Sequence, residues 1–269
     1  MKRLLCCALF VLFACEPPPG PLPSAGTRIV TLNLEWLGHR SRGGRTQEDI
    51  QRLAEYVNEL NADVYGLQEI VDVRLARRIF SGYRVECAGS EQKVCIASRL
   101  PLSRVRAYRD LNVGGLRPGL DAVVRMGDGR GLRLLVVHLK SGCHSRSLTS
   151  EKKACVKLRS QLPILERWID ARAREDLPFV VLGDFNRRMH SRDAFYEDLD
   201  DGQPANADLF SPGIDESYRC GRYTRFIDFI LLDARATKLY QPDSFDWLDW
   251  PDGDEFILSD HCPIYLDLK

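Results

Sequence analysis

Eight polar side chains stand where short apolar runs end or are interrupted, and their types could do chemistry together. They are Asn33, Glu69, His138, Asp184, Asn186, Asp228, Asp260 and His261. Burying an unpaired charge is costly, so ionisable groups in such places need partners. Carboxylate and amide oxygens suit Mg²⁺ or Mn²⁺ better than zinc, and histidines can move protons. The pattern indicates a site assembled at the tips of strands.

Taken singly, most of these residues also have a structural explanation. Asn33 could cap a turn, Glu69 could be the acid of a helix N-terminus, and His138 could be a satisfied histidine at a strand end. The segment 184–186 could be an Asx-rich loop, and Asp260 could cap the segment after it. Asp228 is the hardest to explain this way, because it interrupts the apolar run Phe226–Ile230.

Apolar runs typical of buried strands alternate with segments of helical period. We expect strands over 28–34, 62–67, 83–87, 93–97, 105–109, 122–126, 132–138, 179–182, 226–232 and 263–268. Thr46 should cap a helix that carries Ile50 to Leu60, residues 71–80 should form a second, and a third should begin near Thr149, with a kink or a split at Pro163. This alternation predicts layered α/β packing in a single domain over 28–269.

The first 27 residues are predicted to be an export signal and a tether. Lys2 and Arg3 precede the apolar run Leu4–Ala14, which is too short to span a bilayer but suits a signal peptide. Residues 12–15 resemble a bacterial lipobox, in which Cys15 would be acylated, and the proline-rich segment 16–27 would be the tether. The alternative is a plain secretory signal. The protein is therefore expected in the bacterial cell envelope, anchored by lipid on the periplasmic or surface side, or secreted if the lipobox is not used.

Six cysteines remain once Cys6, Cys7 and Cys15 are assigned to the signal and the lipid anchor. They are Cys87, Cys95, Cys143, Cys155, Cys220 and Cys262. An even number in an oxidising compartment predicts disulfides, and the spacing does not fit a zinc site. We expect neighbours to pair: Cys87 with Cys95 across a hairpin, Cys143 with Cys155, and Cys220 with Cys262.

Charge is distributed unevenly, although the net charge of the chain is zero. Residues 99–174 hold 17 Lys/Arg against 6 Asp/Glu, a net of +11, whereas residues 193–269 hold 6 against 18, a net of −12. Such a polarised molecule could steer an anion toward a cation-binding site. The two faces could equally be ordinary solvated surfaces that pair with each other.

Seven short motifs occur in an order that resembles the endonuclease/exonuclease/phosphatase superfamily. They are Thr31-Leu32-Asn33, Leu67-Gln68-Glu69, Arg117-Pro118, Val137-His138-Leu139-Lys140-Ser141, Gly183-Asp184-Phe185-Asn186, Ile227-Asp228-Phe229 and Ser259-Asp260-His261-Cys262-Pro263. The resemblance implies an α/β fold, a four-layer α/β/β/α sandwich of two mixed β-sheets packed face to face with flanking helices. It also implies a Mg²⁺-dependent phosphodiesterase, with Mn²⁺ or Ca²⁺ as alternative metals.

The resemblance further implies roles for the individual residues. Glu69 would be the principal metal ligand with Asn33 beside it, and Asp260 would lie near the metal or at a second metal position. Asp184 would orient or deprotonate the attacking water, and Asn186 would position water or phosphate. His261, held by Asp228, would contact the phosphate, and His138 would donate to a phosphate or leaving oxygen. Arg117 matches a phosphate-contacting arginine, and its guanidinium suits that task.

Three interpretations of the substrate remain open. A nuclease acting on DNA or RNA is favoured by the basic region 99–174, which includes Arg104, Arg106, Arg109, Arg117, Lys140, Arg146, Lys152 and Lys153. A phospholipase C-like enzyme of the sphingomyelinase type is suggested by Trp247, Trp250 and Phe256, since aromatic residues suit membrane interfaces. The third is an inactive lipoprotein that uses the fold for binding. No protein partner is evident, and a monomer is expected.

Overall fold

The computed structural model describes residues 26–42, 44–217, 219–221, 223–250 and 257–269. The predicted signal peptide with Cys15, and all of the predicted tether except Gly26 and Thr27, lie outside the described residues. In the part of the chain that the structure describes, no helix has both the length and the apolar character needed to cross a bilayer.

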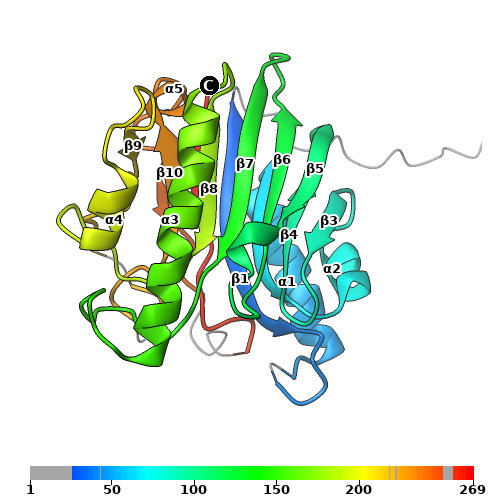
Figure 1. Cartoon of the computed structure of the whole chain (residues 1–269). Helices are drawn as coiled ribbons and strands as arrows, with labels where there is room; N and C mark the ends of the chain where they lie inside the picture. Colours follow the sequence, from blue (N-terminus) through cyan, green and yellow to red (C-terminus); the bar gives the residue numbers. More distant parts are fainter. Residues whose placement is uncertain (1–25, 43, 218, 222, 251–256) are drawn as a thin grey trace, which may run out of the picture.

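Two six-stranded mixed sheets pack face to face (Figure 1). The first has the order β11-β12-β1-β2-β4-β3 and consists of β1 (Thr27–Leu37), β2 (Val64–Ile70), β3 (Arg84–Ala88), β4 (Lys93–Ser98), β11 (Asp246–Trp247) and β12 (Ile264–Leu268). The second has the order β5-β6-β7-β8-β10-β9 and consists of β5 (Leu102–Tyr108), β6 (Gly119–Arg125), β7 (Gly131–His138), β8 (Phe179–Asp184), β9 (Leu209–Phe210) and β10 (Asp228–Asp233).

Helices flank the sandwich on both outer faces, which completes the four layers (Figure 1). The helices are α1 (Gln47–Leu60), α2 (Val73–Ile79), α3 (Lys153–Ala173), α4 (Ala194–Leu199) and α5 (Ala234–Thr237), with the short 3₁₀ helix η1 (Arg109–Leu111). Central strands are covered by the other sheet on one side and by helices on the other. They are therefore apolar on both faces, and Leu134–Val137 in β7 are completely buried. The predicted four-layer sandwich is confirmed.

Each sheet contains one parallel pair of strands, β1–β2 in the first and β7–β8 in the second. The other paired strands in both sheets are antiparallel. Parallel neighbours end at the same edge of a sheet, so the side chains that follow them gather there. This topology brings residues from distant parts of the sequence to one end of the sandwich.

The predicted start of α1 is confirmed by its capping interactions. The Thr46 hydroxyl accepts a hydrogen bond from the Asp49 N–H at 3.2 Å, and the Asp49 carboxylate accepts one from the Thr46 N–H at 2.7 Å. These reciprocal bonds satisfy backbone donors that the first helical turn leaves free. Ile50, Leu53 and Val57 are buried, as their spacing predicted.

A kink or a split was predicted at Pro163; the split is wrong, because α3 is one helix from Lys153 to Ala173. Leu158 and Leu162 before the proline, and Leu165 and Ile169 after it, are all buried. Tertiary packing of one apolar face therefore holds both halves in register, and it offsets the lost backbone hydrogen bond. The helix also begins later than expected, since the hydroxyls of Ser147 and Ser150 accept hydrogen bonds from the backbone of 149–152.

Three disulfides join the pairs that the sequence predicted. Cys87–Cys95, Cys143–Cys155 and Cys220–Cys262 have Cα–Cα distances of 4.1, 5.0 and 5.7 Å. Cys87 and Cys95 are directly opposite each other in the β3–β4 ladder. Three disulfides in a chain of this size indicate an oxidising compartment outside the cytoplasm.

Candidate active site

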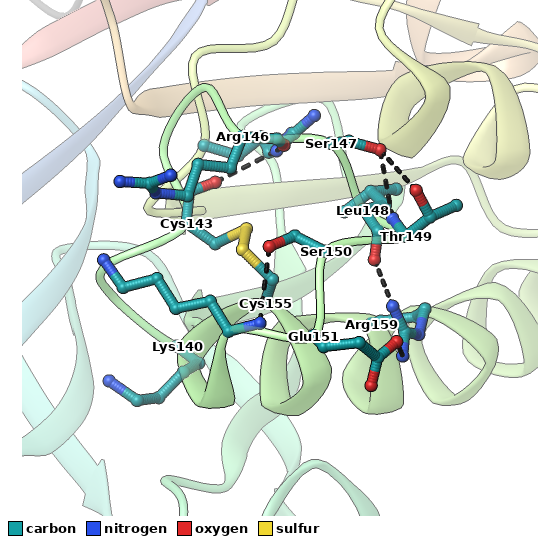
Figure 2. The surroundings of a disulfide bond; sticks show 12 residues. Lys140, Cys143, Arg146, Ser147, Leu148, Thr149, Ser150, Glu151, Cys155 and Arg159 are labelled. Carbon is teal, nitrogen blue, oxygen red and sulfur yellow. Dashed lines mark hydrogen bonds and ion pairs between the residues drawn. A yellow bond between two sulfur atoms is a disulfide. The ribbon is translucent and has the colours of Figure 1, made fainter.

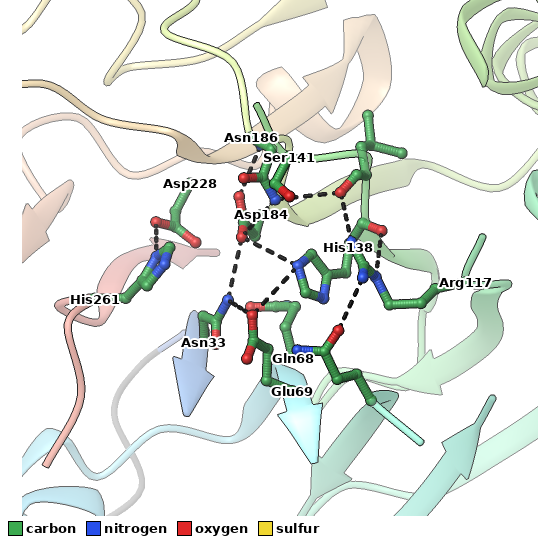
Figure 3. A network of polar contacts seen from close by, with 12 residues as sticks. Asn33, Gln68, Glu69, Arg117, His138, Ser141, Asp184, Asn186, Asp228 and His261 are labelled. Atoms are coloured by element: carbon green, nitrogen blue, oxygen red, sulfur yellow. Dashed lines mark hydrogen bonds and ion pairs between the residues drawn. The ribbon is translucent and has the colours of Figure 1, made fainter. Parts of the chain in front are cut away.

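A cavity of about 500 Å³ lies at the end of the sandwich where the parallel strands finish, and its volume is in the range of ligand sites. Eight of the nine predicted site residues line it: Glu69, Arg117, His138, Asp184, Asn186, Asp228, Asp260 and His261. Asn33 is fully buried and donates hydrogen bonds to Glu69 and Asp184 (Figure 3). The structure thus brings together all of the side chains that the sequence singled out.

Irregular pairing at the ends of β1 and β2 turns Glu69 into the cavity. The parallel register runs to Asn33–Gln68 and then shifts before it resumes at Leu37–Ile70. Glu69 has φ +59°, and Glu35 and Trp36 have φ +36° and +52°. Left-handed conformations cost energy in residues other than glycine, and bulges of this kind re-aim side chains beside sites.

Asn33 connects the two acids nearest to it. Its Nδ2 donates to Asp184 Oδ2 at 3.1 Å and to Glu69 Oε1 at 3.4 Å, while its Oδ1 accepts from the Glu35 N–H at 2.9 Å. The second Glu69 oxygen accepts from the Trp36 N–H at 3.1 Å. The bulge therefore supplies a backbone donor to the same carboxylate that it re-aims.

Asp184 lies at the tip of β8, directly opposite His138 at the tip of β7. The preceding Gly183 allows this close approach, because a Cβ there would lie 2.0 Å from the Val137 carbonyl oxygen. Asp184 accepts hydrogen bonds from the Asn186 N–H at 2.7 Å and from Asn186 Nδ2 at 2.9 Å. Burial and the nearby Asp228 charge raise the pKa of Asp184 to about 7.

His261 and Asp228 form the pair that the sequence analysis expected. His261 Nδ1 lies 2.7 Å from Asp228 Oδ2, and Asp228 faces Asp184 across the antiparallel β8–β10 ladder. Burial alone would lower the pKa of His261. The charge and hydrogen bond of Asp228, with Asp184 and Asp260 nearby, outweigh burial and raise that pKa well above its usual range. His261 is therefore a charged donor at neutral pH.

His138 has the opposite protonation state. Burial, followed by the positive charges of Arg117 and His261, holds its pKa well below the usual range, so the imidazole is neutral. Its Nε2 lies 3.4 Å from Asp184 Oδ2 and 3.6 Å from Glu69 Oε1. Among the described residues its buried Nδ1 has no hydrogen-bond partner. The site thus combines one charged and one neutral imidazole.

Arg117 donates from three of its nitrogens to protein acceptors. Nε and Nη2 bond to the carbonyl oxygens of His138 and Leu139 at 3.2 and 2.8 Å, and Nη1 bonds to Gln92 Oε1 at 2.9 Å. Arg117 therefore fixes the segment that follows β7. Its predicted contact with phosphate stays a prediction.

Two residues that the sequence analysis did not place in the site hold the loop of His261. Ser259 Oγ donates to the Asn33 carbonyl at 2.7 Å and accepts from the His261 N–H at 3.1 Å. Trp250 Nε1 donates to the His261 carbonyl at 2.8 Å, and Trp250 is only 4% exposed. Trp250 therefore cannot be the exposed aromatic residue that the membrane interpretation required, and Phe256 lies outside the described residues.

Each disulfide lies next to a segment that lines the cavity. Cys87–Cys95 closes the hairpin that contains Gln92, and Cys143–Cys155 ties the segment after Ser141 to the start of α3 (Figure 2). Cys262 directly follows His261, and its disulfide reaches Cys220 on the segment that carries Tyr223. Further lining residues that the sequence analysis missed are Trp36, Gln92, His144, Arg188, Tyr223 and Arg225.

The oxygen-rich donor set fits a hard divalent cation. Within the described ranges, no Lys or Arg forms an ion pair with Glu69, Asp184 or Asp260. One Asp228 oxygen is buried without a hydrogen-bond partner among those residues. Asp184, Asp228 and His261 also bring possible ligand atoms within 4.8 Å of one another. Because Asp228 and His261 already pair at 2.7 Å, we favour the Glu69 side of the cavity for a metal.

A sequence model of the endonuclease/exonuclease/phosphatase family matches residues 30–261. No curated protein sequence gives a significant match. Among solved structures, D. rerio TDP2 complexed with a single-strand DNA product has a TM-score of 0.68 and 20% identity, covering 91% of this chain and 100% of that chain.

Two further solved structures show the same fold. The catalytic domain of human Nocturnin with a bound sulfate anion has a TM-score of 0.61 and 16% identity, covering 91% of this chain and 94% of its own. The 3′ phosphatase NExo from Neisseria, bound to a product DNA hairpin, has a TM-score of 0.61 and 17% identity, covering 90% and 99%. At these identities the likeness concerns the fold.

Proposed function

Because this chain belongs to the endonuclease/exonuclease/phosphatase family, we propose that it is a divalent-metal-dependent phosphodiester hydrolase that acts as a nuclease on DNA or RNA. The observation that carries the proposal is the group of acids in the cavity, which have no Lys or Arg ion pair among the described residues. Several kcal/mol of unfavourable burial and repulsion would be relieved by a bound cation.

The metal would be held by Glu69 and Asp260, with Asn33 beside them. When bound, Mg²⁺ or Mn²⁺ supplies charge stabilisation for the attacked phosphate. Asn33 orients the Glu69 carboxylate by its hydrogen bond, and the Trp36 N–H fixes the second Glu69 oxygen. The bulged ends of β1 and β2 thus preorganise the carboxylate before substrate arrives.

Asp184 and His261 would manage the protons and charge of the reaction. A carboxyl group with a pKa of about 7 can accept a proton from an attacking water near neutral pH. His261, charged and oriented by Asp228, donates a hydrogen bond to a phosphate oxygen. Asn186 positions water or phosphate with the side-chain amide that already donates a hydrogen bond to Asp184. Neutral His138 donates a hydrogen bond to the phosphate or to the leaving oxygen.

A nucleic-acid substrate is supported by the arginines at the cavity and by the fold relatives. The D. rerio TDP2 and Neisseria NExo structures contain DNA products. The phospholipase interpretation loses support because Trp250 is buried. If the protein were an inactive binding lipoprotein, there would be no physical reason for several acids to lie together without cationic partners.

The proposal includes export and lipid anchoring. The disulfides support an oxidising compartment, and the lipobox-like residues 12–15 support acylation of Cys15. The protein would act as a monomer held at the membrane by the tether 16–27. Mass spectrometry of the unreduced exported protein should find lipid on Cys15 and no free thiol among the six remaining cysteines.

One experiment tests the activity directly. The protein is incubated with plasmid DNA, RNA, sphingomyelin and inositol phosphates, with Mg²⁺ or with a chelator. Cleavage of nucleic acid that the chelator abolishes supports the proposal. Release of phosphocholine alone selects the phospholipase interpretation, and inertness toward all four substrates selects the binding lipoprotein.

A further inference from the structure

Three arginines line the cavity, and they differ in what their guanidinium groups contact. Arg117 is bonded to protein acceptors, as described above. Arg188 and Arg225 are exposed, and neither guanidinium forms a hydrogen bond or ion pair within the described part of the chain. No ion pair within the described residues therefore neutralises their positive charge at the cavity.

Arg188 contrasts with its neighbour Arg187. Arg187 is 4% exposed, and it bonds the Asp193 carboxylate at 2.6 and 2.9 Å and the Cys143 carbonyl at 3.0 Å. The backbone N–H of Arg188 donates a hydrogen bond to the His144 carbonyl at 2.8 Å, while the Arg188 side chain lines the cavity. The buried arginine is thus a structural anchor that fixes the exposed one beside Asn186.

The backbone around Arg225 is also held by packing and by a disulfide. The next residue, Phe226, is 5% exposed and packs against the rings of Phe229 and Phe245. Cys220, five residues before Arg225, is tied to Cys262 and bridges to Tyr223. A buried ring and a disulfide therefore flank the segment that carries Arg225.

His144 lines the same cavity without adding charge. Burial and then the charge of Arg188 lower its pKa, so the ring is neutral, and among the described residues its Nδ1 has no hydrogen-bond partner. The two exposed guanidinium groups and the neutral imidazole therefore line the same cavity as the acids Glu69 and Asp184.

We propose that Arg188 and Arg225 form a subsite for a second phosphate, next to the phosphate that is cleaved. This inference rests on the proposed function and narrows it to a nucleic-acid strand with at least two neighbouring phosphates. A guanidinium donates paired hydrogen bonds that match phosphate oxygens. A phosphocholine headgroup has one phosphate and a cationic ammonium, which two arginines would repel.

Binding measured without hydrolysis tests the subsite. A fluorescein-labelled single-stranded decanucleotide is titrated in chelator against wild type, Arg188→Gln, Arg225→Gln and the double variant. We expect the double variant to bind about tenfold more weakly or worse, since hydrogen bonds to charged groups are being lost. The slope of log affinity against log salt should fall by about 0.7, the value for one phosphate contact on a single strand.

Arg192→Gln is the matched control, because Arg192 is exposed, close in sequence and outside the cavity lining. It removes the same charge and should leave the affinity within about twofold of wild type and the salt slope unchanged. An equal loss in Arg192→Gln, or no loss in the double variant, would overturn the subsite.

Short substrates provide the second measurement. Dinucleotides with one internal phosphodiester are compared with the same dinucleotides carrying an additional 5′ or 3′ terminal phosphate. Wild type should cleave one of the two phosphorylated forms with about tenfold higher kcat/KM, and the double variant should reduce this preference to about twofold. Equal cleavage of all three forms by wild type would contradict the subsite while leaving the nuclease intact. Failure to cleave any phosphodiester would instead reject the proposed function, and the binding result would still decide the subsite.

Discussion

Two buried aspartates in the same sheet, Asp121 in β6 and Asp184 in β8, have opposite environments. Asp121 accepts hydrogen bonds from Arg133 at 2.8 and 2.9 Å, from Arg106 at 3.1 Å and from the Trp168 ring N–H at 3.1 Å. Burial alone would raise the pKa of Asp121, but these donors and the charge of Arg133 outweigh it and lower that pKa.

Asp184 is as deeply buried, yet its hydrogen-bond donors are amides rather than guanidinium groups. Its pKa is raised to about 7, because burial and the Asp228 charge are not offset by a close Lys or Arg within the described residues. Asp121 shows what a structural buried acid looks like when the protein itself satisfies it. Asp184 retains an unfavourable charge that a cation, a proton or a reacting water can relieve.

The largest difference should appear in stability. Asp121→Asn leaves Arg133 buried without its counter-charge, and we expect it to lower the free energy of unfolding by about 3–5 kcal/mol. Asp184→Asn should leave that free energy unchanged or raise it, because it removes a desolvated acid. Denaturant unfolding of both variants in chelator measures the contrast. Equal destabilisation by the two substitutions would remove the distinction between the two regions.

The next effect concerns turnover. Glu69→Ala and His261→Ala should each lower the rate about a hundredfold or more, since each removes charge stabilisation or proton transfer from the reaction. Circular dichroism should show that both variants remain folded. Asp121→Asn, assayed below its unfolding temperature, is the matched control and should keep a rate near that of wild type. A near-normal rate in either cavity variant would remove that residue from the site.

Metal binding should then depend on pH in a direction fixed by Asp184. Asp184 has a pKa of about 7 in the folded protein and about 3.9 in the unfolded chain, so the folded protein binds its proton more tightly. This proton binding contributes its full stabilisation of the metal-free fold below about pH 4. This contribution is lost as the pH rises through 7. Mg²⁺ at ten times its Kd should add about 1.4 kcal/mol at pH 8 and less at pH 6, where the cation competes with a proton.

Thermal unfolding with Mg²⁺ or chelator at the two pH values measures this dependence. Asp184→Asn should flatten it, and a Mg²⁺ effect that is larger at pH 6 would contradict the interpretation.

The smallest effect tests whether a raised pKa alone marks a site. Burial, with Asp201 and Asp170 nearby, raises the pKa of Glu166 to about 8, although Glu166 lies on α3 outside the cavity lining. Its contribution to stability is present below its unfolded pKa and is lost as the pH rises through 8. Glu166→Gln should therefore stabilise by about 0.5 kcal/mol at pH 8.5, after allowance for solvent screening, and by less at pH 5. Activity should be unchanged; a loss would mean that this acid contributes to the reaction.

The strands, the start of α1 and the disulfides Cys87–Cys95 and Cys143–Cys155 could be predicted from sequence because their causes are local. Apolar alternation, the Thr46 cap and the spacing of Cys87 and Cys95 all act over a few residues. The short elements β9, β11, α4 and α5 escaped prediction, because each has too few residues for a period to be visible. Pro163 misled the prediction, since long-range packing outweighed a local preference.

The sequence by itself singled out the acids, histidines and asparagines that gather at the cavity, because motif order and strand ends already contain that information. Only the tertiary structure decided their states. Burial and neighbours from distant strands make His261 charged and His138 neutral. Arg117 forms hydrogen bonds to protein acceptors, whereas Arg188 and Arg225 stay exposed at the cavity. Charge interactions depend on distance and solvent exposure in three dimensions, which residue spacing along a chain does not specify.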